Sequence, residues 1–174
     1  MFVAPVAPAV GDPITAAQAA IIVADIIAGP NMGTPASQAA GTAGTASAGT
    51  TEVRDAVLGN YTFTSVAGRR YEAHLNGLVA NGSVVGDLFA VNIRNGGAST
   101  PTATSPLCAT VQAYIPAIGV SGRVTCQLLG SFVPGAGVQT LSCFTVRVLG
   151  SGVSTPVSST YAPRELYVVD VGPA

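Results

Sequence analysis

The sequence has no lysine, no tryptophan and a single histidine, and only 9% of its 174 residues are charged. Soluble domains carry roughly 25% charged residues. All seven basic residues are arginines, the formal net charge is −1, and the arginines form no basic cluster. A nucleic-acid-binding surface needs cations that neutralise phosphates. We therefore expect no nucleic-acid partner.

Long hydrophobic runs are also missing, although the mean hydropathy is high at +0.51. The most apolar stretch, residues 14–28, contains Asp25 and is shorter than the roughly 20 residues that span a bilayer. No basic residue precedes Arg54, so neither a membrane span nor a signal peptide with a cationic start is expected. A hydrophobic chain with too few charges to cover its surface is expected to lie against neighbours in an assembly.

Cysteine is scarce as well, with Cys108, Cys126 and Cys143 as the only three. Their number is odd and their spacing lacks a CxxC pair, which argues against a zinc site and against a full disulfide framework. We expect free thiols that pack as small hydrophobic residues. A Cys126–Cys143 disulfide remains an alternative if their strands are neighbours.

No arrangement of residues typical of catalysis or metal binding is found, and we expect neither an enzyme nor a cofactor. His74 lies between Glu72 and Asn76 on the polar face of an expected strand, which favours a solvated or interfacial pair, and no GxSxG motif accompanies it. Asp55 or Asp87 could still meet another carboxylate in space. The eight carboxylates lack metal-ligand spacing and are Asp12, Asp25, Glu52, Asp55, Glu72, Asp87, Glu165 and Asp170.

Residues 1–52 are expected to form an N-terminal arm. Residues 1–12 alternate proline with small apolar residues, which favours an extended or polyproline-like conformation. A helix is predicted over 13–28, because Asp12 can cap it and Pro13 suits its first position. Residues 29–52 are rich in Gly, Ala, Thr and Ser and are predicted to be a linker without a core.

The predicted helix is too apolar to stand alone in water. Its apolar residues recur at spacings of three and four, and further isoleucines widen the apolar surface. The helix can pack on its own domain or dock on a partner, and we favour the partner slightly. The residues of the arm that are expected to bind the partner are Phe2, Val3, Ile14, Ile21, Ile22, Ile26 and Ile27.

Residues 53–174 are predicted to form an all-β domain. Tyr71, Ala73 and Leu75 alternate with polar residues, and Phe89, Val91 and Ile93 do the same in the next strand. Turn signals such as Asn95-Gly96-Gly97 separate about seven such strands. The pattern is typical of an antiparallel β-sandwich or jelly-roll-like domain.

Three segments of the β-domain resemble small β-domains in virion proteins of tailed phages that infect actinobacteria. The run Phe63–Tyr71 is similar to an "FT-x-VAGRRY" opening, and Gly86–Gly97 is similar to "GD-x-F-x-V-x-IR-x-GG". The ending Arg164–Pro173 is similar to "RELYVEDVGP", with Val169 in place of an acidic residue. The resemblance covers roughly residues 60–173.

The resemblance implies a structural virion protein of the phage head or tail. The short chain, with its arm and apolar helix, favours a capsid decoration protein. Such a protein is expected to bind the major capsid protein on the head surface and to be assembled in the host cytoplasm. Identical copies are expected to form a homotrimer around local threefold axes.

Two other functions are left open. The first is a minor tail or fibre protein whose β-domain binds host-surface glycans, for which Tyr61, Tyr114 and Tyr161 could supply aromatic platforms, although each is expected in the core or at its rim. The second is an enzyme acting on cell-wall polysaccharide through Glu72 and His74.

Overall fold

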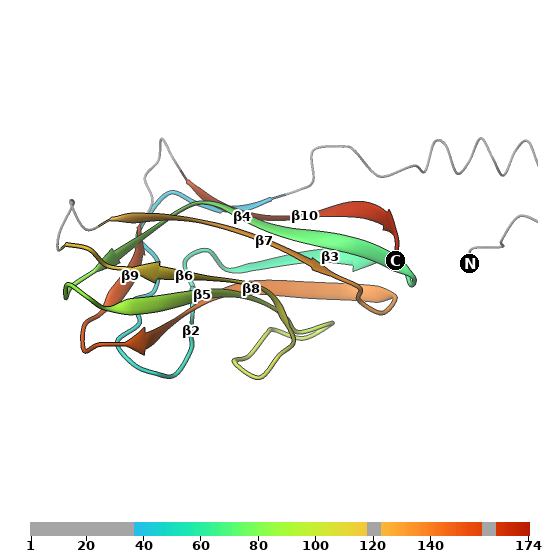
Figure 1. Ribbon diagram of the computed structural model, residues 1–174. Helices are drawn as coiled ribbons and strands as arrows, with labels where there is room; N and C mark the ends of the chain where they lie inside the picture. Colours follow the sequence, from blue (N-terminus) through green and yellow to red (C-terminus); the bar gives the residue numbers. More distant parts are fainter. Residues whose placement is uncertain (1–36, 118–122, 158–162) are drawn as a thin grey trace, which may run out of the picture. The chain divides into compact units, whose positions relative to one another are not determined.

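The computed structural model describes residues 37–117, 123–157 and 163–174, and all of their regular structure is β-strand (Figure 1). These residues belong to one compact unit, Thr34–Ala174. The prediction of an all-β domain is confirmed, and the strands are more numerous than the seven expected. They are β1 (Gln38–Ala40), β2 (Val53–Arg54), β3 (Asn60–Ser65), β4 (Arg69–Gly82), β5 (Leu88–Asn95), β6 (Leu107–Tyr114), β7 (Val124–Phe132), β8 (Gly137–Leu149), β9 (Ser154–Val157) and β10 (Arg164–Pro173).

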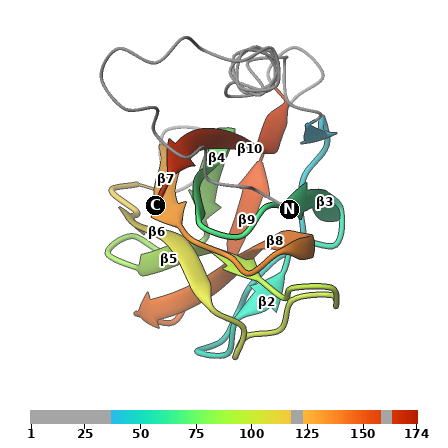
Figure 2. The same ribbon diagram turned by 90° about the vertical axis from the view of Figure 1, so that its right-hand side faces the viewer.

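The strands form two antiparallel sheets that lie one above the other (Figure 2). The first sheet has the order β1-β10-β4-β7, and β9 pairs with the far end of β4, on the same side as β10. The second has the order β2-β8-β5-β6, and β3 pairs with the first half of β8, on the same side as β2. The long strands β4 and β8 therefore each hold two shorter strands end to end.

The core lies between the sheets and follows from the alternation of side chains along each strand. Tyr71, Ala73 and Leu75 of β4 point inward as predicted, and Val91 and Ile93 of β5 meet them from the other sheet. Because burial of apolar surface contributes about 25 cal/mol per Å², this shared layer is the main source of stability. Cys126 and Cys143 pack in the same core as free thiols.

The outer face of β5 is buried, which the alternation of its residues did not show. Asn92 and Ala90 lie on that face and are both buried. The reason is that β5 is a central strand, and the side chain of Glu52 crosses its outer face to accept a hydrogen bond from Asn92. The alternation of residues along a strand does not show that a side chain from another segment covers one of its faces.

The segment before residue 53 also differs from the prediction. Residues 38–40 form β1 and pair with β10, and Ser47 forms a bridge with Ser154, so part of the predicted linker belongs to the β unit. Its small residues serve this packing, because a Cβ at Gly44 would lie 2.6 Å from Asp55 Oδ2. The unit thus begins before the boundary between residues 52 and 53 that composition suggested.

The predicted helix over 13–28 and the seven predicted partner-binding residues, from Phe2 to Ile27, lie outside the described residues. Within the described ranges, no helix has the length and apolar character needed to cross a membrane.

Candidate functional site

A groove opens where the β5–β6 and β7–β8 loops meet. Its volume is about 420 Å³, and it is lined by Asn95–Gly97, Ser105–Cys108, Phe132–Gly135 and Gln139. None of these residues carries a formal charge at neutral pH. Pockets that bind ligands combine apolar walls with a few polar groups, and this groove has both.

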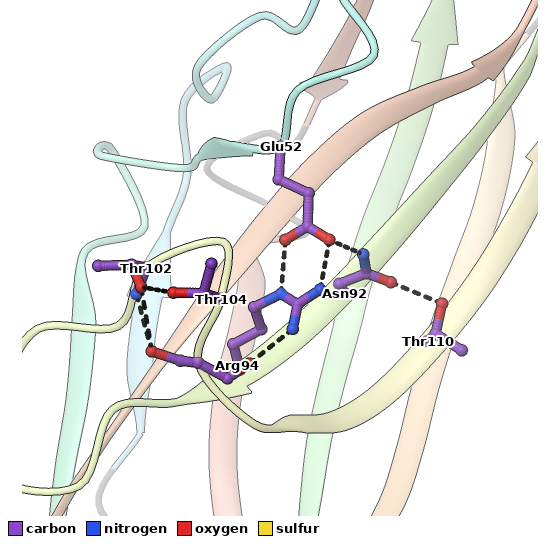
Figure 3. A network of polar contacts seen from close by, with 7 residues as sticks. Glu52, Asn92, Arg94, Thr102, Thr104 and Thr110 are labelled. Atoms are coloured by element: carbon purple, nitrogen blue, oxygen red, sulfur yellow. Dashed lines mark hydrogen bonds and ion pairs between the residues drawn. The ribbon is translucent and has the colours of Figure 1, made fainter.

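An ion pair fastens one wall of the groove to the sheet (Figure 3). Arg94 Nε donates to Glu52 Oε2 and Arg94 Nη2 donates to Glu52 Oε1, both at 2.6 Å. Arg94 Nη1 donates to the carbonyl oxygen of Ser105, also at 2.6 Å, which holds the loop in place. The hydrogen bonds to Glu52 raise the pKa of Arg94 above its ordinary value. Bidentate pairs of this kind fix geometry as well as charge.

Two neutral side chains extend the same network across the outer face of the second sheet. Asn92 Nδ2 donates to Glu52 Oε1 at 2.7 Å, and Asn92 Oδ1 accepts from the Thr110 hydroxyl at 2.6 Å (Figure 3). Strands β5 and β6 and the residue before β2 are thereby tied together. The strands that carry the loops of the groove are thus cross-linked by side-chain hydrogen bonds, and binding sites depend on such support.

The polar part of the groove consists of two side-chain amides. Asn95 Nδ2 donates to Gln139 Oε1 at 2.8 Å, and Asn95 Oδ1 accepts from the backbone N–H of Gly97 at 2.9 Å. Gln139 Nε2 donates to the carbonyl oxygen of Gly135 at 3.2 Å. Each amide nitrogen uses one of its two N–H groups in these contacts. Gln139 is 7% exposed, so the half-buried Asn95 is the amide that a carbonyl-bearing ligand could reach.

The rim of the groove is apolar. Leu107 is 49% exposed and Val133 is 55% exposed, and Pro106 is exposed as well, whereas Pro134 is buried. Phe132 lines the groove but is half-buried, and its ring packs against Tyr71 and Phe63, with centroid distances of 6.2 and 6.3 Å. A ligand of this groove should be uncharged, apolar in its side chains and able to accept hydrogen bonds.

Cys108 lies at the base of the groove, where β6 and β7 run close together. A Cβ at Gly130 of β7 would lie 2.0 Å from the carbonyl oxygen of Cys108, so only glycine permits this approach. Burial raises the pKa of the Cys108 thiol to about 12, and the nearby Arg94 lowers it by a smaller amount. The thiol is protonated at neutral pH and is not a nucleophile.

This burial predicts slow alkylation of Cys108. At pH 8 the thiolate fraction should be on the order of 1,000-fold below that of an ordinary cysteine, so iodoacetamide should modify Cys108 correspondingly slowly. Mass spectrometry of the native and the urea-unfolded protein measures both rates, and the unfolded chain is the control. Equal rates in the two states would contradict the burial.

The structure brings Glu72 and His74 together on the outer face of the first sheet, on a different sheet from Gln139. His74 Nε2 lies 3.5 Å from Glu72 Oε2, and its ring stacks on Tyr167 with the centroids 4.8 Å apart. This arrangement is the neighbouring pair that the sequence indicated. The hypothesis of a polysaccharide-degrading enzyme stays a prediction, which loss of activity in a His74→Ala variant would support.

The candidate tyrosines lie in different surroundings. Tyr61 is buried in the core and stacks on Phe63 with the centroids 6.0 Å apart, whereas Tyr114 is 57% exposed at the end of β6. Tyr161 lies outside the described residues.

The sequence left open that Asp55 or Asp87 lies beside another carboxylate, but each of the two binds a different kind of group. Asp55 pairs with Arg164, and Asp87 accepts the backbone N–H groups of Ser151 and Gly152. In the part of the chain that the structure describes, no cluster of three or more His, Cys, Asp or Glu residues could hold a metal ion.

A second surface feature, which we call the apolar end, was missed by the sequence analysis. It lies where β6 and β8 end and β5 begins, at the left of Figure 1. The segments 83–88, 113–115 and 148–153 that form it contain one charged residue, Asp87, which is buried. The exposed large hydrophobic residues of this end are Val84, Val85, Tyr114, Val148, Leu149 and Val153.

The signal for the apolar end was present in the sequence as hydrophobic residues beside turn glycines, such as Val85 before Gly86 and Leu149 before Gly150. Only the strand pairing, in which Leu88 lies opposite both Tyr114 and Leu149, shows that these residues gather at one place.

No protein-family model matches the chain. A search of curated proteins gives no match either.

Proposed function

We propose that the protein is a non-enzymatic structural protein of a phage virion, and that it decorates the outer face of the head. In this proposal the N-terminal arm binds the major capsid protein, and the β-domain holds identical copies together. The observation that carries the proposal is the apolar end, because an exposed apolar patch on a small domain marks an interaction surface. The resemblance of residues 60–173 to phage virion domains supports the same function.

The strand order supports the proposal as well. If β2 and β3 count as one strand and β9 and β10 as another, the sheets have four strands each, and we infer a jelly-roll topology. Jelly rolls occur in viral capsid and lectin domains. Because a fold by itself does not define a function, the surface carries more weight than the topology.

The distribution of charge also favours assembly through apolar contacts. Five of the seven arginines bind acceptors within the domain, so few cations remain to attract an acidic partner. Three of these pair with carboxylates and two bind neutral oxygens; the five are Arg54, Arg69, Arg94, Arg147 and Arg164.

The apolar end predicts an effect on self-association. A Leu149→Asp variant should shift the full chain from trimer to monomer, with at least a tenfold weaker association, because a carboxylate would be buried in the contact. Leu129→Asp is the matched control: Leu149 is 65% and Leu129 62% exposed, but Leu129 lies on the outer face of the first sheet. Sedimentation velocity measures both. Equal behaviour of the two variants would contradict a role for the apolar end.

The copy number of the chain in purified virions tests the location. Quantitative mass spectrometry against the major capsid protein should give hundreds of copies per particle, near-stoichiometric with the shell. A handful of copies would contradict a decoration role and would assign the protein to the tail or to a single vertex.

A minor tail protein that binds host-surface glycans is the second candidate, because Tyr114 offers an exposed aromatic ring. Aromatic rings stack on the apolar faces of sugars. Binding of the full chain to a glycan array, lost in a Tyr114→Ala variant, would favour this function over decoration.

A further inference from the structure

We propose that the groove between the β5–β6 and β7–β8 loops binds residues 1–10 of a neighbouring copy, in an extended, proline-rich conformation. This contact goes beyond the proposed function, because it assigns an occupant to the groove and gives Phe2 and Val3 to a neighbouring copy. The capsid contact of the arm is then left to the helix predicted over 13–28. The interaction can be measured with the purified protein, without a virion.

The groove has the chemistry of a site for a polyproline-type segment. Such segments dock on aromatic-lined grooves, and their backbone carbonyls have no internal partners. The half-buried Phe132 lines the groove, and the exposed side chains of Pro106, Leu107 and Val133 supply its accessible apolar surface.

The amides of the groove supply one complementary donor. Asn95 and Gln139 are held by contacts to each other and to the backbone, so their orientation is fixed before a ligand arrives. The half-buried Asn95 has a second N–H for a ligand carbonyl, whereas the buried Gln139 holds the Asn95 amide in place. Preorganised donors reduce the entropy lost on binding.

Residues 1–10, MFVAPVAPAV, match this chemistry. The segment has no charged side chain, and its sequence places Phe2, Pro5 and Pro8 at a spacing of three. A polyproline II helix has three residues per turn. The three residues would therefore share one face, which could lie along Phe132 and the exposed Pro106.

The chain between this segment and the β unit is long enough to reach a neighbour. Residues 11–37 number 27. With the helix predicted over 13–28 at about 1.5 Å per residue and the other residues extended at about 3.3 Å, they span up to roughly 60 Å. Strand β4, with its 14 residues, is roughly 46 Å long by the same measure. A tether longer than the β unit can exchange between the copies of a homotrimer, and this exchange would add avidity.

A labelled peptide tests the groove directly. The receptor is a full-length Pro5→Glu/Pro8→Glu variant, whose own segment cannot compete, and the probe is a fluorescein-labelled MFVAPVAPAV peptide. Fluorescence anisotropy should show saturable binding that weakens at least tenfold when Val133→Asp is added. Val85→Asp is the matched control, because the two valines are 55% and 53% exposed but Val85 lies at the apolar end; it should leave the affinity unchanged.

Several outcomes would overturn the proposal. These are an absence of saturable peptide binding, equal affinities of the Val133→Asp and Val85→Asp receptors, or unchanged affinity of a peptide with both prolines replaced by alanine. If Val133→Asp fails to fold by circular dichroism, Leu107→Asp at the opposite wall takes its place.

The identity of the donor copy is tested separately. If the segment comes from a neighbour, the Pro5→Glu/Pro8→Glu chain should have a weaker association constant than the wild type by sedimentation equilibrium, even where the apolar end still holds the copies together. Peptide binding with an unchanged association constant would show that each groove takes its own chain's segment, and would overturn the neighbour assignment. Leu149→Asp should lower self-association without changing the peptide affinity, which keeps failure of this proposal distinct from failure of the proposed function.

Discussion

Replacing Arg164 by methionine is expected to lower the free energy of unfolding by about 3–5 kcal/mol, because the change leaves a buried carboxylate without its counter-charge. The side chains of Arg164 and Asp55 are 0% and 1% exposed, and Arg164 Nε donates to Asp55 Oδ2 at 2.8 Å. Water cannot reach a charge at this depth to solvate it.

The cost is high because the pair holds three parts of the chain together. Asp55 Oδ1 also accepts the backbone N–H groups of Thr45, Val57 and Leu58 at 3.1–3.2 Å. Arg164, at the start of β10, donates to the carbonyl oxygen of Thr42. The pair thus fastens the segment after β1 and the β2–β3 loop to β10.

Urea unfolding of the full chain, followed by circular dichroism, measures the loss. Arg69→Met is the matched control, because the Arg69–Asp170 pair has side chains that are 17% and 20% exposed and should contribute at most about 1 kcal/mol. Equal losses in the two variants would contradict a special role for the buried pair. A double Asp55→Leu/Arg164→Met variant should recover only part of the stability, since three backbone N–H groups lose their acceptor.

The features of the fold that depend on local pattern were predictable from the sequence. Alternation of apolar and polar residues identified the inward face of β4, and the turn signal Asn95-Gly96-Gly97 correctly marked the end of β5. Side-chain direction reverses at each step along a strand, so a few residues suffice to assign faces.

Features that depend on distant pairing were not predictable. Asp55 and Arg164 are 109 positions apart, and nothing in either local sequence shows that they meet. The small residues around Ala40 gave no signal of burial, because they pack by fitting closely rather than by hydrophobic size.

The groove is an intermediate case. Its walls come from two turns that were recognisable, at Asn95–Gly97 and Val133–Gly135, but the sequence did not show that these turns face each other. That arrangement follows from β8 returning beside β5, where Asn95 pairs with Leu141 two positions from Gln139.

Replacing Gly150 by alanine is expected to lower the free energy of unfolding by about 3 kcal/mol, from a backbone effect and a steric effect combined. Gly150 has φ +98°, a conformation that alanine adopts only at a cost of about 1 kcal/mol. An alanine Cβ would also lie 1.8 Å from Asp87 Oδ1. The Asp87 carboxylate is buried and accepts the N–H of Gly152 at 2.6 Å, so it cannot move aside without losing that hydrogen bond.

Gly68→Ala separates the two effects, because Gly68 has φ +73° and a Cβ there would meet no atom within 4 Å. Its loss should be about 1 kcal/mol, so the difference of about 2 kcal/mol measures the contact with Asp87. Equal losses in urea unfolding would mean that the loop moves away from Asp87 freely. Since this loop joins Leu149 to Val153, a loop held by Asp87 also fixes the apolar end, and Gly150→Ala should then weaken self-association where Gly68→Ala does not.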